Sequence, residues 1–134
     1  MKSRRWLLLV ILILAAGIWR FTAGRPDGAR AAERAFTQRV SGVVLTVPGE
    51  VVRILEDDER PPRHQRFIIR TPRAQTLLVL HNIDVAPRVP VRIGDAVTVR
   101  GEYVWNEEGG LVHKTHGRIR GGARGWIRGA WPLD

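Results

Sequence analysis

Apolar and polar residues alternate with a period of two along much of the chain after residue 42, which is the pattern of strands with one buried face. In the clearest run, from Ala96 to Trp105, Val97, Val99 and Tyr103 alternate with polar side chains. Comparable short runs are bounded by glycine, proline or charged residues. The predicted strands cover residues 42–55, 65–71, 76–81, 96–105 and 111–119.

Turn-forming residues between these runs predict how the strands connect. Residues 72–75 predict a tight turn and residues 106–110 a second hairpin turn. Pro48-Gly49 interrupts the first run, which is therefore one strand with a bulge or two strands with a turn. Residues 56–63 form a charged loop with two prolines, and residues 82–90 form an irregular connection.

The spacing of the strands predicts an all-β domain over residues 42–134. The first strand is long and interrupted, and Gly94-Asp95 leads into an alternating run that contains Gly101. These features fit the oligonucleotide/oligosaccharide-binding (OB) fold, so we expect a small five-stranded OB-like barrel preceded by an N-terminal hydrophobic helix. A sandwich of five or six strands is the alternative.

The N-terminus has the layout of an export sequence. Lys2, Arg4 and Arg5 precede an unbroken apolar or small run over residues 6–19. Residues 1–23 are therefore a cleaved signal peptide or an uncleaved signal-anchor helix, which would attach the protein to the inner membrane through residues 6–23. Either alternative predicts an extracytoplasmic domain that is periplasmic, secreted or anchored in the inner membrane.

Composition changes this picture in three ways. Residues 24–41 are rich in glycine, alanine and arginine and predict a linker or a fraying helix. The formal charge of +9 divides into +5 for residues 1–35 and +4 for residues 36–134. The domain is thus only mildly basic, which makes nucleic acid an unlikely partner. Cysteine is absent, which excludes thiolate metal sites and cysteine nucleophiles.

Ionisable and polar side chains on the predicted strands and their ends are the first candidate site, because such groups must be paired or functional. The cluster consists of His64, His81, Asn82, Asp84, Glu102, His113 and His116. On one strand, His113 and His116 point to opposite faces, so we predict no metal site built on both. A shared site for acid/base chemistry requires His64, His81, Asp84 and His116 to meet at one barrel end. The simpler interpretation is that the histidines and Asn82 hydrogen-bond loop backbone.

Basic and aromatic residues near the C-terminus form the second candidate, a surface for single-stranded nucleic acid. It consists of Arg100, Arg118, Arg120, Arg124 and Trp126. Tyr103 and Trp105 alternate in phase with Val97 and Val99, so we assign them to the core rather than to a stacking platform.

Several segments together resemble the bacterial family catalogued as domain of unknown function 3465. They are His64 to Ile68, His81 to Arg88, Gly94-Asp95-x-Val97, Gly101 to Asn106, Gly109-Gly110-x-x-His113 and Thr115-His116. The resemblance implies a small secreted or membrane-tethered protein and carries no activity. The chain departs from the family pattern at Lys114, where relatives tend to have an aromatic residue, and after His116, where they tend to have further His or Asp.

These observations predict a non-enzymatic binding or interaction module. The alternatives are a histidine-dependent or metal-dependent enzyme and a binder of single-stranded nucleic acid. The sequence names no cofactor, ligand or protein partner.

Overall fold

The computed structural model describes residues 27–131, so the predicted leader over residues 1–23 lies outside the described part of the chain. Within residues 27–131, no helix combines the length and the apolar composition that crossing a membrane requires.

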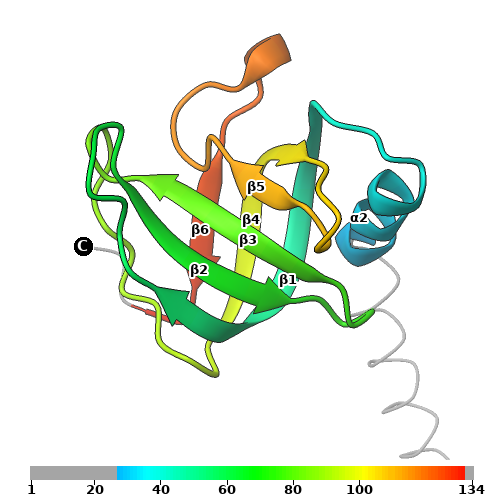
Figure 1. The fold of residues 1–134 in the computed structure, drawn as a ribbon, viewed down its shortest axis with the longest axis horizontal. Helices are drawn as coiled ribbons and strands as arrows, with labels where there is room; N and C mark the ends of the chain where they lie inside the picture. Colours follow the sequence, from blue (N-terminus) through cyan, green and yellow to red (C-terminus); the bar gives the residue numbers. More distant parts are fainter. Residues whose placement is uncertain (1–26, 132–134) are drawn as a thin grey trace, which may run out of the picture.

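Six β-strands and one α-helix make up most of the described chain (Figure 1). The helix is α2 (Gly28–Thr37), and the strands are β1 (Val43–Leu55), β2 (His64–Arg70), β3 (Thr76–Asn82), β4 (Ala96–Val104), β5 (Leu111–His113) and β6 (Trp126–Gly129). The coarse prediction of a mostly β domain is confirmed.

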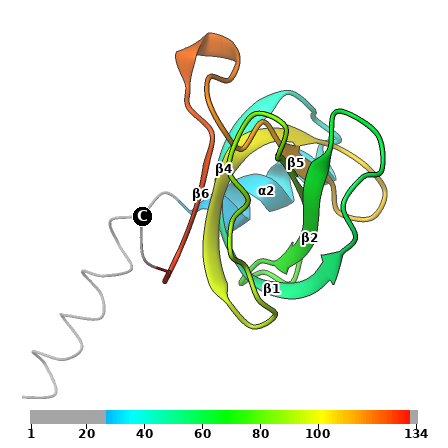
Figure 2. The same cartoon turned by 90° about the vertical axis from the view of Figure 1, so that its left-hand side faces the viewer.

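Five of the strands close into a ring, as the view in Figure 2 shows. The order is β1-β2-β3-β5-β4, and β4 returns to pair with the first half of β1. β3 and β5 are parallel, whereas the other pairs are antiparallel. β6 lies outside the ring, beside the part of β4 that β5 does not cover.

The core fills the ring with the inward residues of each strand. Val47, Phe67, Val79, Val99 and Tyr103 are each fully buried. They come from four different strands because period-two alternation sends every second side chain inward. The Tyr103 hydroxyl donates to the Gly109 carbonyl at 2.9 Å, which satisfies its one buried polar group. The assignment of Tyr103 to the core is confirmed.

Within the predicted linker or fraying helix, residues 28–37 form helix α2, which packs on the ring. Asp27 caps the helix through its side chain, which accepts from the Arg30 amide at 3.0 Å. Ala32 and Ala35 join the core cluster. Their small side chains, which looked like linker composition, are what allows close contact with the strands.

The strand prediction also needs correction at its C-terminal end. The predicted strand over residues 111–119 ends after His113, because Lys114 adopts a left-handed conformation with φ of 52°. β6 was not predicted, since its four residues lie in a glycine-rich segment. β1 is one continuous strand whose bulge falls between Val51 and Arg53 rather than at Pro48-Gly49.

Candidate functional site

His81 lies on the inner face at the end of β3 and is only 4% exposed. Its Nε2 is 2.9 Å from the Pro87 carbonyl and its Nδ1 is 2.7 Å from the Thr115 hydroxyl. Because a carbonyl can only accept, Nε2 carries the proton and Nδ1 accepts from Thr115. Burial lowers the pKa of His81, which keeps the ring neutral. The prediction that this histidine bonds loop backbone is confirmed.

Gln65 pairs with His81 across β2 and β3 and also bonds the backbone of the loop after β3. It is 5% exposed, its amide donates to the Val89 carbonyl at 2.7 Å, and its carbonyl accepts from the Val89 amide at 2.9 Å. Two inward polar residues thus hold the connection between β3 and β4. Sequence reasoning missed Gln65, although a glutamine in phase with Phe67 and Ile69 was a visible signal.

His64 and His116 surround His81 at this end of the ring. The rings of His81 and His116 meet edge to face with centroids 6.1 Å apart. Charges on His116 and His64 add to the effect of burial in lowering the pKa of His81, and burial followed by the charge of His64 lowers the pKa of His116. His64 itself bonds Asp58 through Nδ1 at 2.7 Å.

Asp84 and Asn82 have local structural partners nearby. Asp84 accepts from the Arg63 backbone at 2.8 Å and from its Nε at 3.0 Å, and these bonds lower the pKa of the carboxyl group. Asn82 accepts from the Asp84 amide at 2.9 Å. Both carboxyl oxygens of Asp84 therefore bind the loop before β2, and Asn82 fixes a turn after β3.

Glu102, His113 and Lys114 form a separate group on the outer surface, away from the other three histidines. Glu102 is 8% exposed and lies 3.0 Å from Nε2 of His113 and 3.3 Å from Nζ of Lys114. The hydrogen bond from His113 and the contact with Lys114 lower the pKa of Glu102. His113 and His116 contact different groups, but the strand ends between them, so the predicted reason, opposite faces of one strand, does not apply.

Two features limit the chemistry available around His81: the Thr115 hydroxyl is inaccessible, and both ring nitrogens of His81 are hydrogen-bonded. Thr115 and His81 form a hydroxyl–imidazole pair, but Thr115 is 1% exposed, so a substrate cannot reach the hydroxyl. Both nitrogens of His81 already have partners. Over the described residues, no group of three or more His, Asp or Glu side chains is placed to hold a metal ion. This arrangement holds loops together.

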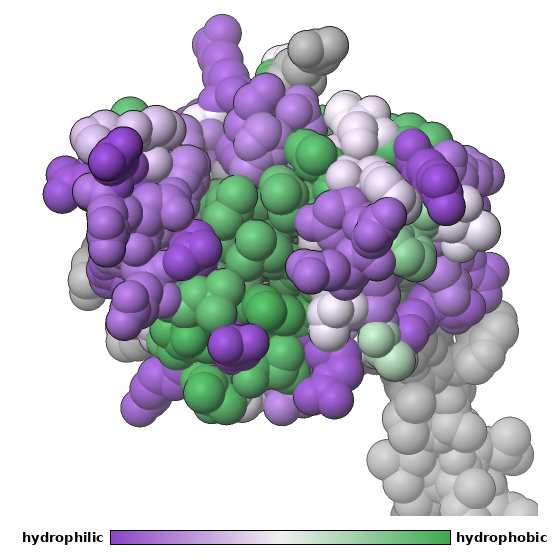
Figure 3. Space-filling view, in the orientation of Figure 1, coloured by the Kyte–Doolittle hydropathy of each residue, from purple (hydrophilic) through white to green (hydrophobic). Residues whose placement is uncertain are grey.

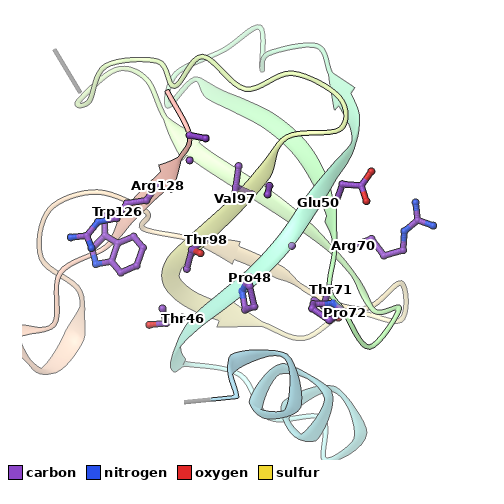
Figure 4. Close-up of a pocket in the computed structure, with 14 residues that line it drawn as sticks. Thr46, Pro48, Glu50, Arg70, Thr71, Pro72, Val97, Thr98, Trp126 and Arg128 are labelled. Carbon is purple, nitrogen blue, oxygen red and sulfur yellow. The ribbon is translucent and has the colours of Figure 1, made fainter. Parts of the chain in front are cut away.

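An open groove of about 940 Å³ runs over the outer face of β1, β4 and β6 (Figure 4). Pro48, Val97 and Thr98 lie along its middle, Trp126 and Arg128 of β6 lie on one side, and Arg70 to Pro72 lie on the other. The guanidinium group of Arg128 lies over the Trp126 ring, 4.2 Å from its centroid.

Of the predicted basic and aromatic residues, Trp126 lines this groove and the others do not. Trp126 pairs with Arg100 across β6 and β4, and Arg124 forms an isolated bridge with Arg118 just before β6. Arg120 begins the short 3₁₀ helix η1 (Arg120–Gly122), which lies between Arg118 and Arg124 in the chain.

The family profile described as "Protein of unknown function (DUF3465)" matches residues 12–131. The chain belongs to the DUF3465 family. No curated protein matches the chain. The family assignment confirms the resemblance inferred from the motifs. Because the DUF3465 description names no activity, a function has to be inferred from the geometry of the structure.

Away from the groove, the part of the DUF3465 ring formed by β2 and β3 has an apolar outer surface. The face seen in Figure 1 carries an apolar area over β2 and β3 (Figure 3). The outward residues of these strands include Ile68, Leu78 and Leu80, which alternate with the buried core positions. Arg66 is also on this face, but its Nε donates to the Glu56 carbonyl. The groove over β1, β4 and β6 is thus the better candidate for a charged or planar ligand.

The sequence analysis did not predict the groove. Pro48, Thr98 and Arg70 come from distant strands and carry no motif. The period-two series Arg124, Trp126, Arg128 was the available signal, because alternate residues of an extended segment share a face.

Proposed function

We propose that this protein is a non-enzymatic binding module with an OB-like barrel, exported from the cytoplasm, whose ligand lies in the groove over β1, β4 and β6. The ring order, with β4 returning to β1 and with β3 parallel to β5, supports the OB-like assignment. Export rests on the sequence of residues 1–23, and mass spectrometry of the mature N-terminus tests it.

The observation that carries the proposal is the groove with the Trp126–Arg128 stack beside it. An aromatic ring supplies a large, rigid contact surface with little conformational entropy to lose, and a stacked guanidinium adds donors and charge. The groove is open and its lining comes from three strands and from the end of β2 and the turn after it, which suits an extended ligand better than a compact substrate. A catalytic role has weaker support, since His64, His81, Asp84, Glu102 and His113 have structural partners.

Indole N–H signals of the ¹⁵N-labelled full chain provide the test. A Trp126→Phe variant assigns the Trp126 signal, and Trp105 is an internal control because its Nε1 donates to the Phe36 carbonyl at 3.0 Å. The probes are a neutral oligosaccharide, a proline-rich peptide, an acidic peptide and oligo(dT). We expect at least one probe to shift the Trp126 signal in a saturable manner while Trp105 stays unchanged. If none does so at millimolar concentration, the groove is not a binding site of this kind and the proposal is wrong.

A further inference from the structure

Four arginines and one tryptophan lie on β6, on the segment before it and at the positions paired with them, and two of the five, Trp126 and Arg128, line the groove. Trp126 and Arg128 are alternate residues of β6, about 6.6 Å apart along the strand, and Arg124 lies two residues before Trp126 in an isolated bridge. Arg118 stands opposite Arg124 and Arg100 stands opposite Trp126. We call these five residues the Arg/Trp strip. Four positive charges thus lie on the paired segments that carry the indole, and one of them, on Arg128, lies over its ring.

The guanidinium groups at the centre of the strip are held by neutral partners. Arg100 donates to the Thr46 hydroxyl at 2.9 Å, and Arg128 lies on Trp126. Among residues 27–131, no strip arginine forms an ion pair, whereas other arginines of the domain do. The paired arginines are Arg30, Arg63, Arg66, Arg73 and Arg88. The strip therefore keeps its charge and its free donors for an anion.

The groove beside the strip has few groups for recognising hydroxyls. Its lining includes the hydroxyls of Thr46, Thr71 and Thr98 but a single carboxylate, Glu50, and no Asn, Gln or Asp. In Figure 4, Glu50 lies on the far side of the groove from Trp126. Sugar hydroxyls would enter such a groove with too few partners, which weakens binding. Phosphates and stacked planar bases need only cationic donors and a flat aromatic or guanidinium surface.

We infer that the Arg/Trp strip binds single-stranded nucleic acid, with phosphates on the arginines and a base extending the Arg128–Trp126 stack. A single strand is favoured over a duplex because its base faces are free to stack. The inference rests on the proposed binding groove and specifies its ligand. The sequence disfavoured nucleic acid because the domain carries little net charge. The inference depends instead on the placement of four of its fifteen Lys/Arg residues, which lie on the paired segments that carry Trp126.

Fluorescence anisotropy of labelled dT20 with the purified full chain tests the inference. We expect binding that weakens as salt rises from 50 to 200 mM, as counterion release requires. Replacing Trp126 by Ala should weaken binding about 5- to 150-fold through loss of stacking. The double variant Arg100→Gln/Arg128→Gln should lower the slope of log K against log salt by about 1.4. Arg60→Gln, in the loop between β1 and β2, removes one exposed charge away from the strip and should change affinity less than about twofold.

Competitors distinguish this inference from its alternatives. Duplex DNA and an acidic polysaccharide at equal charge should compete poorly with dT20. If they compete equally, or if Trp126→Ala binds dT20 as tightly as the natural protein, the strip is a general polyanion surface and the inference is wrong. Absence of dT20 binding at 50 mM salt overturns it as well. A neutral oligosaccharide or peptide that binds in a Trp126-dependent manner, with no dT20 binding, would leave the proposed groove intact while refuting the nucleic-acid ligand.

Discussion

At the scale of single residues, the buried polar side chains act mainly as structural fasteners. His81 donates to one loop and accepts from another, and Gln65 makes two bonds to the backbone of Val89. Glu102 is held by His113 and Lys114 on the outer surface. Burial without these partners would be unfavourable, so each residue type is explained by the groups that it satisfies.

Replacing His81 by Ala should destabilise the fold by about 2–4 kcal/mol, because it removes two hydrogen bonds and leaves a cavity. Urea unfolding of the full chain, followed by circular dichroism, measures the change. His113→Ala is the control and should have a smaller effect, since its ring is partly exposed. Equal effects of the two substitutions would contradict the assigned role of His81.

Stability should fall as the pH drops from 7 to 5. The folded-state pKa of His81 and that of His116 both lie below the usual 6.5, so the unfolded chain takes up protons first. The stabilisation from a neutral His81 is therefore complete above pH 6.5 and is lost as the pH falls toward the folded-state pKa, at no more than about 1.4 kcal/mol per pH unit.

Urea unfolding at pH 7, 6 and 5 measures this loss. His81→Gln keeps a donor and an acceptor but cannot titrate, so its stability should depend less on pH in this range. Glu102 does not contribute there, because its pKa is lowered from 4.5. An unchanged pH dependence in His81→Gln would show that other groups are responsible.

At the scale of elements, close approach decides where helix α2 lies. A Cβ atom on Gly28 would collide with the Thr46 carbonyl of β1. The glycine therefore serves packing, although alanine is the better helix former. The small residues that made this segment look like a linker are the same ones that let the helix contact the sheet.

Gly28→Ala should accordingly lower the free energy of unfolding by about 1–3 kcal/mol, despite the gain in helix propensity. Thr37→Ala, at the exposed end of the same helix, should be neutral or slightly stabilising. Thermal unfolding of both variants makes the comparison. A stabilised Gly28→Ala variant would mean that α2 does not lie against β1 in solution.

At the scale of the whole molecule, β1 is the element that closes the ring. Its first half pairs with β4 and its second half with β2. β6, by contrast, has four residues and pairs only with β4 among the described strands. The groove and the Arg/Trp strip thus lie partly on the stable pair of β1 and β4 and partly on the peripheral strand β6.

Hydrogen exchange should reflect this difference. Amides of β1 and β4 that bond each other should exchange most slowly, through global unfolding, whereas those of β6 should exchange through local opening. Peptide-level exchange with mass spectrometry measures both. Equal protection of β6 and β1 would contradict this hierarchy and would make β6 an integral part of the ring.

The sequence by itself determined the strands, their inward residues and the family. Period-two alternation is local, and burial of Val97, Val99 and Tyr103 follows from it directly. The pattern did not predict the packing of α2, the early end of β5 at Lys114 or β6, because short or small-residue segments take their structure from tertiary contacts.

Only the tertiary structure decided which polar groups meet. It brought the rings of His81 and His116 together, with His64 near enough for its charge to lower both pKa values. It also paired His113 with Glu102 and placed Trp126 in one groove with Pro48 and Thr98. The physical reason is that strand pairing joins residues far apart in the chain, and nothing local in their spacing encodes that contact.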